Sequence, residues 1–421
     1  MTAATAIASP LPERAERAAD RLPVKHARRL RRILELEDFT AAARHRLPRA
    51  VFGYVANGAE DETALHTNRS AFQDWRFITR VLVGVADRTQ ETRLFGRSYA
   101  APFGIAPMGA SAVVAYDGDV VLARAAAAGG VPFVLSASSI TPLERVAQAA
   151  PGQWFAAYQA PDPSAIERMV DRVARAGFEV LVVTADLPVG SNRVKDRRNG
   201  FSLPIRPNLQ LIGNGAIHPG WSLGTALRTL LTRGAPRLAN LGPDGGPSLF
   251  SRDVRHIGAH DRLSWEHIRL MRRRWQGPLV VKGILSAEDA RIARDLGVDG
   301  VVVSNHGGRQ LADAATPLQV LPEIVAAAGH LTIMIDGGFR RGGDVLTALA
   351  LGAHFVFIGR PFLYAAAVAG EAGVLHAIAL LSREIDIDMA LLGLRGTAMV
   401  TREMLFSLRG WNRTGLRAEP G

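Results

Sequence analysis

From about residue 102 onward, short apolar runs alternate with alanine-rich stretches that have helical character. The apolar runs contain many β-branched and aromatic residues but no strict alternation of apolar and polar positions, which indicates parallel strands covered on both faces. Eight such runs predict strands, at Pro102–Pro107, Pro132–Leu135, Trp154–Tyr158, Val180–Thr184, Leu279–Lys282, Gly300–Ser304, Leu331–Ile335 and Phe355–Ile358.

The segments between these strands begin near a capping or acidic residue and end at glycine, as helices prefer. Examples are Asp119–Gly130, Pro163–Gly177, Ala287–Gly297 and Gly343–Gly352. Eight repeats of a strand followed by a helix predict an α/β fold, the (β/α)8 TIM barrel. An open doubly wound sheet is the alternative, but it requires no such count of eight.

Two regions lie outside the repeat. Residues 1–100 precede the first barrel strand and are expected to be mainly helical, with a helix over Leu47–Gly58. Residues 205–260 form a long insertion between the fourth and fifth strands, which is either an amphipathic surface anchor or a flap over the barrel mouth. The expected organisation is a basic extension (1–46), a barrel domain (47–400) and a tail (401–421).

The composition limits the chemistry. With 421 residues, 48% of them hydrophobic, the chain is long enough for one large core. It has no cysteine, which excludes disulfides, thiolate metal sites and cysteine nucleophiles. A reducing cytosol fits this composition, and neither a signal peptide nor an uninterrupted apolar span is recognisable, so we expect a cytoplasmic protein.

The charge is strongly basic, with a formal net value of +11. Such a balance suits nucleic acid, an anionic membrane or anionic substrates. The densest basic run, Arg28–Arg32, is either a solvated helix or a contact with an anionic membrane, which would place the protein peripherally on the inner face of the cell membrane. Nucleic-acid binding is not expected, because the arginines are not interleaved with aromatic residues.

Polar residues recur where the predicted strands end. Because barrel active sites lie at the carboxyl ends of the strands, these residues predict one shared site. The strand-end residues are Ser136, Tyr158, Thr184, Asp186, Lys282, Ser304, Asn305, His306, Asp336, Gly337, Gly338, Gly359 and Arg360.

The segment Asp336–Gly342, followed by Gly359-Arg360, is typical of a phosphate site. Glycines allow backbone N–H groups to approach phosphate oxygens, and arginine supplies a bidentate charge. The loops after strands seven and eight are where barrels commonly bind phosphate. Tight turns with solvated arginines are the alternative interpretation.

Four positions at or near the strand ends carry candidate acid–base or electrostatic chemistry. His306 suits proton abstraction, and Arg309 three residues later can hold a carboxylate. Asp186 either pairs with His306 or caps the next helix. Lys282 follows an apolar strand, where a lysine needs an anion or must lose its proton. It could stabilise a reduced flavin or form the Schiff base of an aldolase.

Together these motifs resemble the FMN-dependent L-2-hydroxy acid dehydrogenase and oxidase family, over about Leu47 to Arg395. The most specific matches are Ser304–Gln310, Asp336–Gly342 with Gly359-Arg360-Pro361, Lys282-Gly283 and Tyr54–Glu62. Within the family, the (S)-mandelate dehydrogenase type is most similar, through Asn68–Phe77 and His218–Leu223. The resemblance implies an FMN cofactor, a small 2-hydroxy acid substrate and, by analogy, a homotetramer.

The resemblance also implies roles for individual residues. His306 takes a proton from the substrate with Asp186 as its partner, and Tyr158 lies beside the substrate oxygen. Tyr54, Arg193 and Arg309 bind the substrate carboxylate. Lys282 faces the flavin edge where negative charge develops. The cofactor-binding set implied is Pro107, Gly109, Ser136, Thr184, Lys282, Ser304, Asp336, Gly338, Arg340, Gly359 and Arg360.

The chain departs from the family pattern at several positions. Gly109 is similar to the dehydrogenase choice, so we expect slow reaction with oxygen and another acceptor, such as a quinone. Met108, Ala156 and Ala312 replace residues that are common in relatives, and the usual aspartate at 312 is absent or shifted to Asp313. Small residues at Ser138 and Gly190, where glycolate-type relatives have bulkier ones, favour an aryl or long-chain substrate.

Two alternatives stay open from the sequence. One is a phosphate-binding barrel aldolase or isomerase that uses Lys282. The other is a catalytically impaired, flavin-binding peripheral membrane protein, which the replacements at Met108 and Ala156 suggest.

Overall fold

The structure, a computed structural model, describes residues 24–158, 162–202, 204–206, 208–242, 245–253 and 260–408. Its centre is a sheet of eight parallel strands in the order β4-β11-β10-β9-β8-β7-β6-β5. A bridge between Ile105 and Phe133 joins the two outer strands and closes the barrel. The strands are β4 (Phe103–Ile105), β5 (Val134–Ser136), β6 (Trp154–Ala157), β7 (Val180–Thr184), β8 (Leu279–Ile284), β9 (Gly300–Val303), β10 (Thr332–Asp336) and β11 (Phe355–Ile358).

All eight predicted strands and the TIM-barrel fold are therefore confirmed. The reason is visible in β7 and β11, in which every residue is buried. Parallel strands with helices outside and side chains inside must be apolar on both faces, so their sequences lack alternation.

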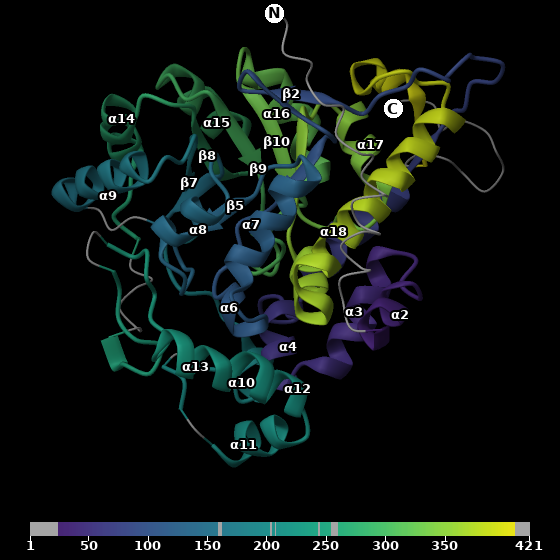
Figure 1. Ribbon diagram of the computed structural model, residues 1–421. Coiled ribbons are helices and arrows are strands. Elements are labelled where there is room, and N and C mark those ends of the chain that lie inside the picture. The colour runs from purple at the N-terminus through teal and green to yellow at the C-terminus, as the bar shows by residue number, and fades with distance from the viewer. Residues whose placement is uncertain are drawn as a thin grey trace, which may run out of the picture.

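Helices surround the barrel, as Figure 1 shows. The four predicted helices are present within two residues of their expected ends, and Asp162 and Ser286 cap two of them with their side chains. The helices outside the barrel are α7 (Gly118–Gly129), α8 (Leu143–Ala149), α9 (Pro163–Arg175), α14 (Trp265–Arg274), α15 (Ala287–Asp295), α16 (Pro317–Ala328), α17 (Gly342–Ala350) and α18 (Arg360–Leu391).

Helix α18 is the one helix in the described part of the chain that is long and apolar enough to cross a membrane. It bends at Ala369 and Gly370, where the backbone leaves the helical conformation, and it packs against α7 and α3 (Leu36–Arg46). Of the 18 residues that make up its most apolar stretch, 72% are buried inside the protein. Its apolar character is therefore accounted for by the protein core.

The amino-terminal end of the barrel is closed by a hairpin of β2 (Thr92–Leu94) and β3 (Arg97–Tyr99). The ring of Phe95 in its turn lies 5.6 Å from that of Trp154, at the start of β6. Tyr99 packs 5.8 Å from Phe355 and accepts a hydrogen bond from the Trp154 indole. Because this end is filled, the opposite end of the barrel is left for the site.

The segment before the barrel is helical only in its first part. It contains α2 (Val24–Leu30), α3, α4 (Arg49–Ala56), α5 (Thr63–Ser70) and a 3-10 turn, so the predicted helix near 47–58 is present as α4. Residues 75–99, however, hold three short strands, which corrects the expectation of a mainly helical segment. One of them, β1 (Trp75–Phe77), pairs with β12 (Leu405–Ser407), so part of the expected tail joins a sheet.

The insertion between β7 and β8, for which an amphipathic surface anchor or a flap was expected, is partly helical. We call its helical part the lobe: α11 (Leu209–Ala216), α12 (Pro219–Trp221), a π-helical turn (Ser222–Leu227) and α13 (Arg228–Arg233). Figure 1 places the lobe at the bottom of the molecule, next to α4 and α10 (Val194–Arg198).

Candidate functional site

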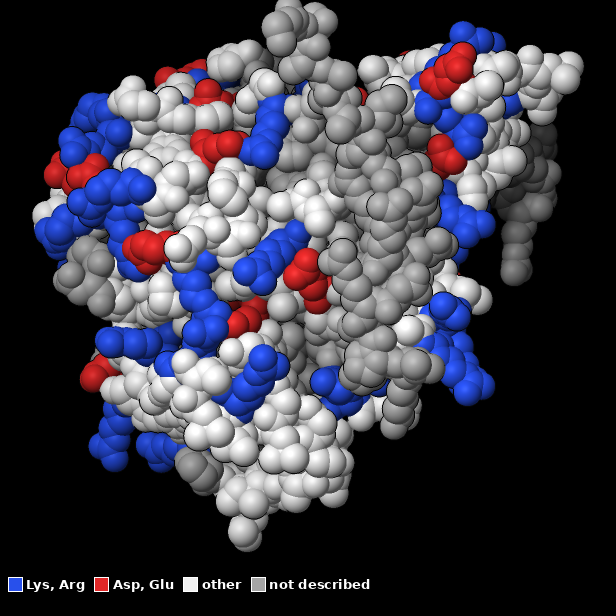
Figure 2. Space-filling model, viewed as in Figure 1, with Lys and Arg blue, Asp and Glu red and all other residues white. Residues whose placement is uncertain are grey.

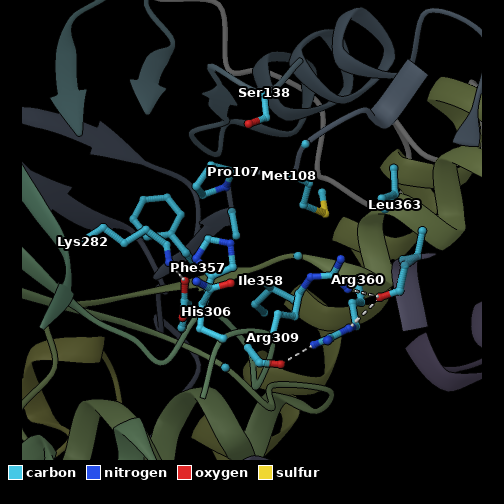
Figure 3. A pocket seen from close by; sticks show the side chains of 18 of the residues that line it. Pro107, Met108, Ser138, Lys282, His306, Arg309, Phe357, Ile358, Arg360 and Leu363 are labelled. Atoms are coloured by element: carbon cyan, nitrogen blue, oxygen red, sulfur yellow. Dashed lines mark hydrogen bonds and ion pairs between the residues drawn. The ribbon is translucent and has the colours of Figure 1, made fainter. Parts of the chain in front are cut away.

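A cavity of about 240 Å³ opens at the carboxyl ends of the barrel strands. In Figure 3, Lys282 and Phe357 lie at its left, Arg360 and Leu363 at its right, and His306 and Met108 between them. The predicted site residues that line the cavity are Tyr54, Pro107, Gly109, Tyr158, Arg193, Lys282, His306, Arg309, Asp336, Gly338, Arg340, Gly359 and Arg360. The other predicted residues, Ser136, Thr184, Asp186 and Ser304, lie at the ends of the same strands.

His306 and Asp186 form the hydrogen-bonded pair that the sequence predicted as one of two possibilities. The His306 Nδ1 atom lies 3.0 Å from Asp186 Oδ1, and the His306 backbone N–H donates to the Ser304 hydroxyl at 3.0 Å. Burial disfavours the charged form of Asp186, but the charges of His306 and Lys282 outweigh it and lower the pKa of Asp186. In the neutral form of the ring, an ionised Asp186 favours the tautomer with the proton on Nδ1, which leaves Nε2 free to act as a base.

His306 is held in an unusual backbone conformation. Its φ is +57°, in the left-handed region that non-glycine residues seldom adopt. The loop around it is anchored by Asn305, whose side-chain amide exchanges two hydrogen bonds of 2.8 Å with that of Asn68. Strained residues persist where the surroundings fix them, as is common in active sites.

Lys282 is buried among acceptors. Its Nζ atom donates to the Ser304 hydroxyl at 2.7 Å, lies 3.0 Å from Asp336 Oδ2 and lies 3.9 Å from Asp186 Oδ2. Burial alone would lower the pKa of Lys282, but the two carboxylates raise it above its ordinary value. The group is therefore an ammonium ion, which suits an electrostatic role.

Two guanidinium groups lie close to the ring of Tyr54. The Arg309 and Arg193 Cζ atoms are 5.3 Å and 5.6 Å from the centre of its ring, and its hydroxyl donates to the Gly109 carbonyl at 3.1 Å. Burial, together with the neighbouring charge of Arg193, lowers the pKa of Arg309 to about 10. Arg309 donates to the Asn57 carbonyl and has no carboxylate partner among the described residues. This arrangement suits a small carboxylate ligand.

Arg360 shows the same lack of an acidic partner within the described chain. It donates to the carbonyl oxygens of Val55 at 2.9 Å and Gly307 at 3.0 Å. Burial and the charge of Arg309 lower the pKa of Arg360 to about 9. Two partly buried guanidinium groups that repel each other favour an anion between or beside them.

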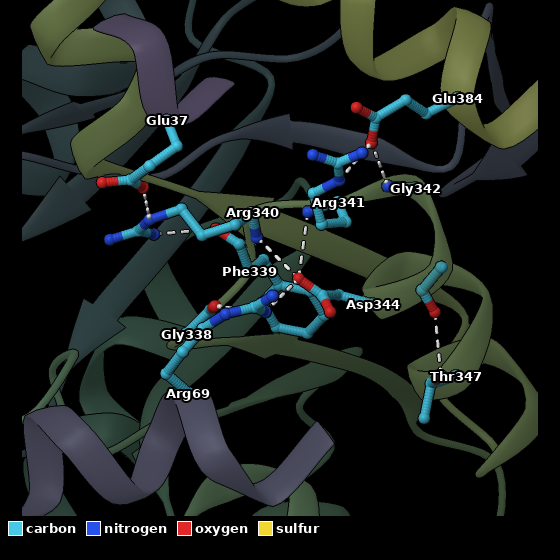
Figure 4. Close-up of polar contacts among 11 residues, drawn as sticks. Glu37, Arg69, Gly338, Phe339, Arg340, Arg341, Gly342, Asp344, Thr347 and Glu384 are labelled. Carbon is cyan, nitrogen blue, oxygen red and sulfur yellow. Dashed lines mark hydrogen bonds and ion pairs between the residues drawn. The ribbon is translucent and has the colours of Figure 1, made fainter. Parts of the chain in front are cut away.

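The glycine loop after β10 is shaped by Asp344, as Figure 4 shows. Its carboxylate accepts the backbone N–H groups of Arg340 and Arg341, at 2.8 and 2.9 Å, and pairs with Arg69. Gly338 has a φ of +85°, and a Cβ atom there would lie 2.2 Å from the Asn68 carbonyl oxygen. Only glycine fits this turn, which brings the loop against the cavity.

The donor and acceptor set fits FMN. The hydroxyl of Thr184 is buried without a hydrogen-bond partner in the described structure, so a polar ring edge at the strand ends would satisfy it. The Gly338 loop and Arg360 offer a cradle for a phosphate, and Lys282 offers a positive charge for a reduced ring.

Some features of the site were not predicted. Phe357 lines the cavity and packs 5.3 Å from Trp154, in the same apolar cluster as Ala156. The partnership of Asn305 with Asn68 was missed, although Asn305 lies inside the predicted motif. Asp344 could have been found from the acidic residue three positions after Arg341, the spacing of a capping box.

The residues noted as departures occupy different environments. Ser138 lines the cavity, whereas Gly190 is exposed and lies outside its lining. Met108 also lines it. Ala312 is buried, and Asp313 is exposed.

The fold and the cavity thus define a barrel protein that binds a phosphate-bearing cofactor beside an acid–base centre. Residues 43–407 match the family described as FMN-dependent dehydrogenase. The chain belongs to this family and is an FMN-dependent oxidoreductase of the 2-hydroxy acid dehydrogenase type.

Two relatives illustrate the similarity. The L-lactate dehydrogenase of Stenotrophomonas maltophilia (strain K279a) is 39% identical over 377 residues, 88% of this chain and 98% of the relative. The (S)-mandelate dehydrogenase of Pseudomonas putida is 39% identical over 363 residues, 86% of this chain and 91% of the relative.

Solved structures give the same result. The crystal structure of the monotopic membrane protein (S)-mandelate dehydrogenase aligns with a TM-score of 0.83 and 36% identity, over 89% of this chain and all of that one. A mandelate oxidase structure with benzoyl-formic acid aligns with a TM-score of 0.74 and 35% identity, over 89% and 98% of the two chains.

Proposed function

We propose that the protein oxidises an L-2-hydroxy acid larger than glycolate to the 2-oxo acid and passes the electrons to a quinone or a similar acceptor. The observation that carries this proposal is that His306, whose Nδ1 atom lies 3.0 Å from Asp186 Oδ1, lines one cavity with Lys282, Arg309 and Arg360. Among the described residues, these two arginines have no carboxylate partner. Such an oxidation needs a base that accepts a proton, cationic groups that bind the substrate carboxylate, and a positive charge that stabilises the reduced flavin.

Each residue of the site has a separate role in the proposed reaction. Arg309 and Arg193, with the Tyr54 hydroxyl, hold the substrate carboxylate. His306 accepts a proton from the substrate at Nε2, and Asp186 stabilises the resulting imidazolium. The oxidation removes two electrons and two protons, and FMN, held by the Gly338 loop and Arg360, would accept both electrons together with the proton that His306 does not take. Lys282 supplies positive charge for the reduced cofactor.

Arg309→Lys tests the carboxylate clamp. Lysine keeps the charge but loses the planar fork, so we expect KM for the 2-hydroxy acid to rise roughly 10- to 100-fold with a smaller effect on kcat. Steady-state kinetics with an artificial acceptor measure both constants. Arg93→Lys, at the exposed position of β2, is the matched control and should change neither. An unchanged KM in Arg309→Lys would remove Arg309 from the clamp.

The lining supports a substrate with an apolar side chain. Ser138 leaves room on one side of the cavity, and Val55, Leu187 and Leu363 contribute apolar surface. A Cβ atom at Gly359 would lie 3.4 Å from the Met108 sulfur, so the thioether lies beside the Gly359 loop. We expect kcat/KM to rise from glycolate to lactate to an aryl or long-chain 2-hydroxy acid.

The proposed acceptor rests on Gly109. A Cβ atom there would lie 3.1 Å from Ser138 Cβ and 3.3 Å from the Tyr54 hydroxyl, so Ser138 and Tyr54 can pack this closely against the strand end because the residue is glycine. Reoxidation of the reduced enzyme should be slow with oxygen and fast with a soluble quinone. Equal rates would contradict the dehydrogenase assignment.

The aldolase alternative is disfavoured by Lys282. An aldolase lysine must be neutral to attack a carbonyl, whereas Asp336 and Asp186 raise the pKa of Lys282 and keep it protonated. Borohydride with a ketone substrate should therefore trap no covalent adduct on this lysine.

We also propose that the lobe contacts an anionic membrane. Among the described residues, it carries a cluster of exposed large apolar side chains, and a neighbour of known structure is a monotopic membrane protein. Figure 2 shows this end of the molecule as largely white, with Lys and Arg where it meets the barrel. The exposed apolar residues are Leu209, Ile212, Ile217, Leu223, Leu227, Leu230 and Leu231.

Leu227→Asn with Leu231→Asn tests this contact. Loss of two leucines from the membrane contact should reduce partition into anionic vesicles by at least about 100-fold, because burial of each in the membrane is worth about 1.5–3 kcal/mol. Leu391→Asn, equally exposed but on α18, is the matched control. Deleting the whole insertion is a poorer test, because Asn240, which lies within it, is buried and bonds to the Leu143 backbone N–H and the Thr141 carbonyl. Unchanged partition in the double variant would refute the lobe as the anchor.

A further inference from the structure

A second cavity, of about 550 Å³, lies between α4 and α10 and is separate from the substrate cavity. We call it the basic groove. Four of its lining side chains are basic: Arg44, Arg49, Lys195 and Arg198. None of these four has been assigned a role in binding the substrate or FMN.

The groove has an excess of positive charge. Its one acidic lining residue, Glu62, pairs with Lys195 and accepts the Gly58 backbone N–H at 3.1 Å, so that charge is compensated. Arg198 is exposed, and within the described residues no ion pair engages it. Arg44 lies with its Cζ atom 4.9 Å from the Phe52 ring. Arginines arranged around a cavity without matching carboxylates favour a multidentate oxyanion.

Arg49 is positioned by its neighbours. Its Nε atom donates to the Asn199 side-chain carbonyl at 3.0 Å, which leaves both terminal nitrogens of the guanidinium available. Phe52 and Ala56 give the groove an apolar floor. The groove therefore offers arginine forks above an apolar surface, a combination that suits a phosphate attached to an organic group.

The groove also adjoins the lobe. The Arg49 backbone N–H donates to the Asn214 side chain of α11 at 3.4 Å. On the same helix, Leu209 and Ile212 are 89% and 61% exposed. A phosphate held in the groove would thus lie at the boundary between the basic surface and the apolar helices, where the headgroups of a membrane meet its acyl chains.

We propose that the basic groove binds the phosphate of an anionic phospholipid headgroup. The inference rests on the proposed membrane contact of the lobe, but it assigns a separate site with its own residues. The lipid phosphate takes its hydrogen bonds from Arg44, Arg49 and Arg198, while its acyl chains extend toward α11.

The groove connects to the substrate cavity through α10. This helix begins directly after Arg193, and Asp196 within it lies 3.4 Å from the Arg193 guanidinium and accepts from the Asn57 side chain at 2.9 Å. Tyr54 lies on α4, between Gly53, which lines the groove, and Val55, which lines the substrate cavity. A headgroup that fixes Arg198 and Arg49 would hold α10 against α4 and keep Arg193 beside Tyr54. Arg198 is thus a positioning residue.

The test is a calorimetric titration of the FMN-loaded enzyme with short-chain phosphatidylglycerol below its micelle concentration, which does not require a bilayer. The wild type should bind it saturably. Arg44→Lys with Arg198→Lys keeps the charge but removes both forks, and should weaken binding roughly tenfold. Arg273→Lys with Arg291→Lys, on exposed positions of α14 and α15 at the other end of the molecule, is the matched control and should bind normally.

A second readout follows the substrate site. Saturating lipid should lower KM for the 2-hydroxy acid in the wild type and in the control, but not in the groove variant. A merely structural role for the two arginines would change stability without this lipid-dependent difference.

Three results would overturn the proposal. They are the absence of lipid binding, equal lipid binding by the groove variant and the wild type, and inorganic phosphate binding as tightly as the lipid, which would indicate a site for free phosphate. Failure of the proposed function would appear differently: every 2-hydroxy acid would fail to reduce the flavin, whatever the lipid titration showed.

Discussion

Replacing His306 with glutamine should lower the rate of flavin reduction by roughly 10²- to 10⁴-fold while FMN stays bound. The glutamine amide can still donate to Asp186, but it cannot accept a proton from the substrate. The glycine loop and Arg360 do not depend on the imidazole, so cofactor content should be unchanged. Anaerobic stopped-flow measurement of flavin reduction, with the bound FMN quantified beforehand, gives both quantities.

The control for this variant is His330→Gln. His330 is exposed in the turn before β10. It therefore lies at the amino end of this strand, whereas the cavity opens at the carboxyl ends of the strands. The control should reduce its flavin at the wild-type rate. If His306→Gln did the same, the imidazole could not be the base, and the mechanism proposed for the cavity would have to be abandoned.

Replacing Lys282 with methionine should have two large effects. Asp336 and Asp186 would lose their buried cation, and breaking a buried pair in this way costs about 3–5 kcal/mol of unfolding free energy. Flavin reduction should also slow strongly, because no positive charge would remain for the reduced cofactor. Denaturant unfolding and stopped-flow kinetics measure the two effects separately.

The double variant Lys282→Met with Asp336→Asn separates stability from catalysis. Removing the unpaired carboxylate should recover much of the lost unfolding free energy, whereas flavin reduction should stay slow. Recovery of the rate along with the stability would mean that Lys282 acts as a structural residue alone.

The barrel could be predicted from the sequence because the signals for its strands and helices are local. Each strand, such as β7 or β11, is a short run of fully buried residues, and each is followed by a segment with helix-ending signals. Once eight strands are recognised, the topology brings their carboxyl ends together. For this reason His306, Lys282 and Asp336 could be placed in one cavity without coordinates.

What the sequence could not provide depends on contacts between distant segments. The β1–β12 pair joins Trp75 to Ser407, and the amide pair behind His306 joins Asn68 to Asn305. Neither partner shows a local pattern that identifies the other. The choice between an Asp186 that caps a helix and one that pairs with His306 was likewise decided by the 3.0 Å contact.

The lobe was hard to predict for another physical reason. Helix α11 has no buried residue, so its apolar positions do not mark a face that packs on a core. The basic groove could not be predicted from the sequence either, because its arginines come from positions as far apart as Arg44 and Arg198.

The most direct test of the central claim is anaerobic addition of an aryl L-2-hydroxy acid to the purified, FMN-loaded protein. The visible flavin absorbance should bleach, and one 2-oxo acid should form for each flavin reduced. A flavin that stays oxidised with every 2-hydroxy acid, from glycolate to aryl acids, would contradict the central claim.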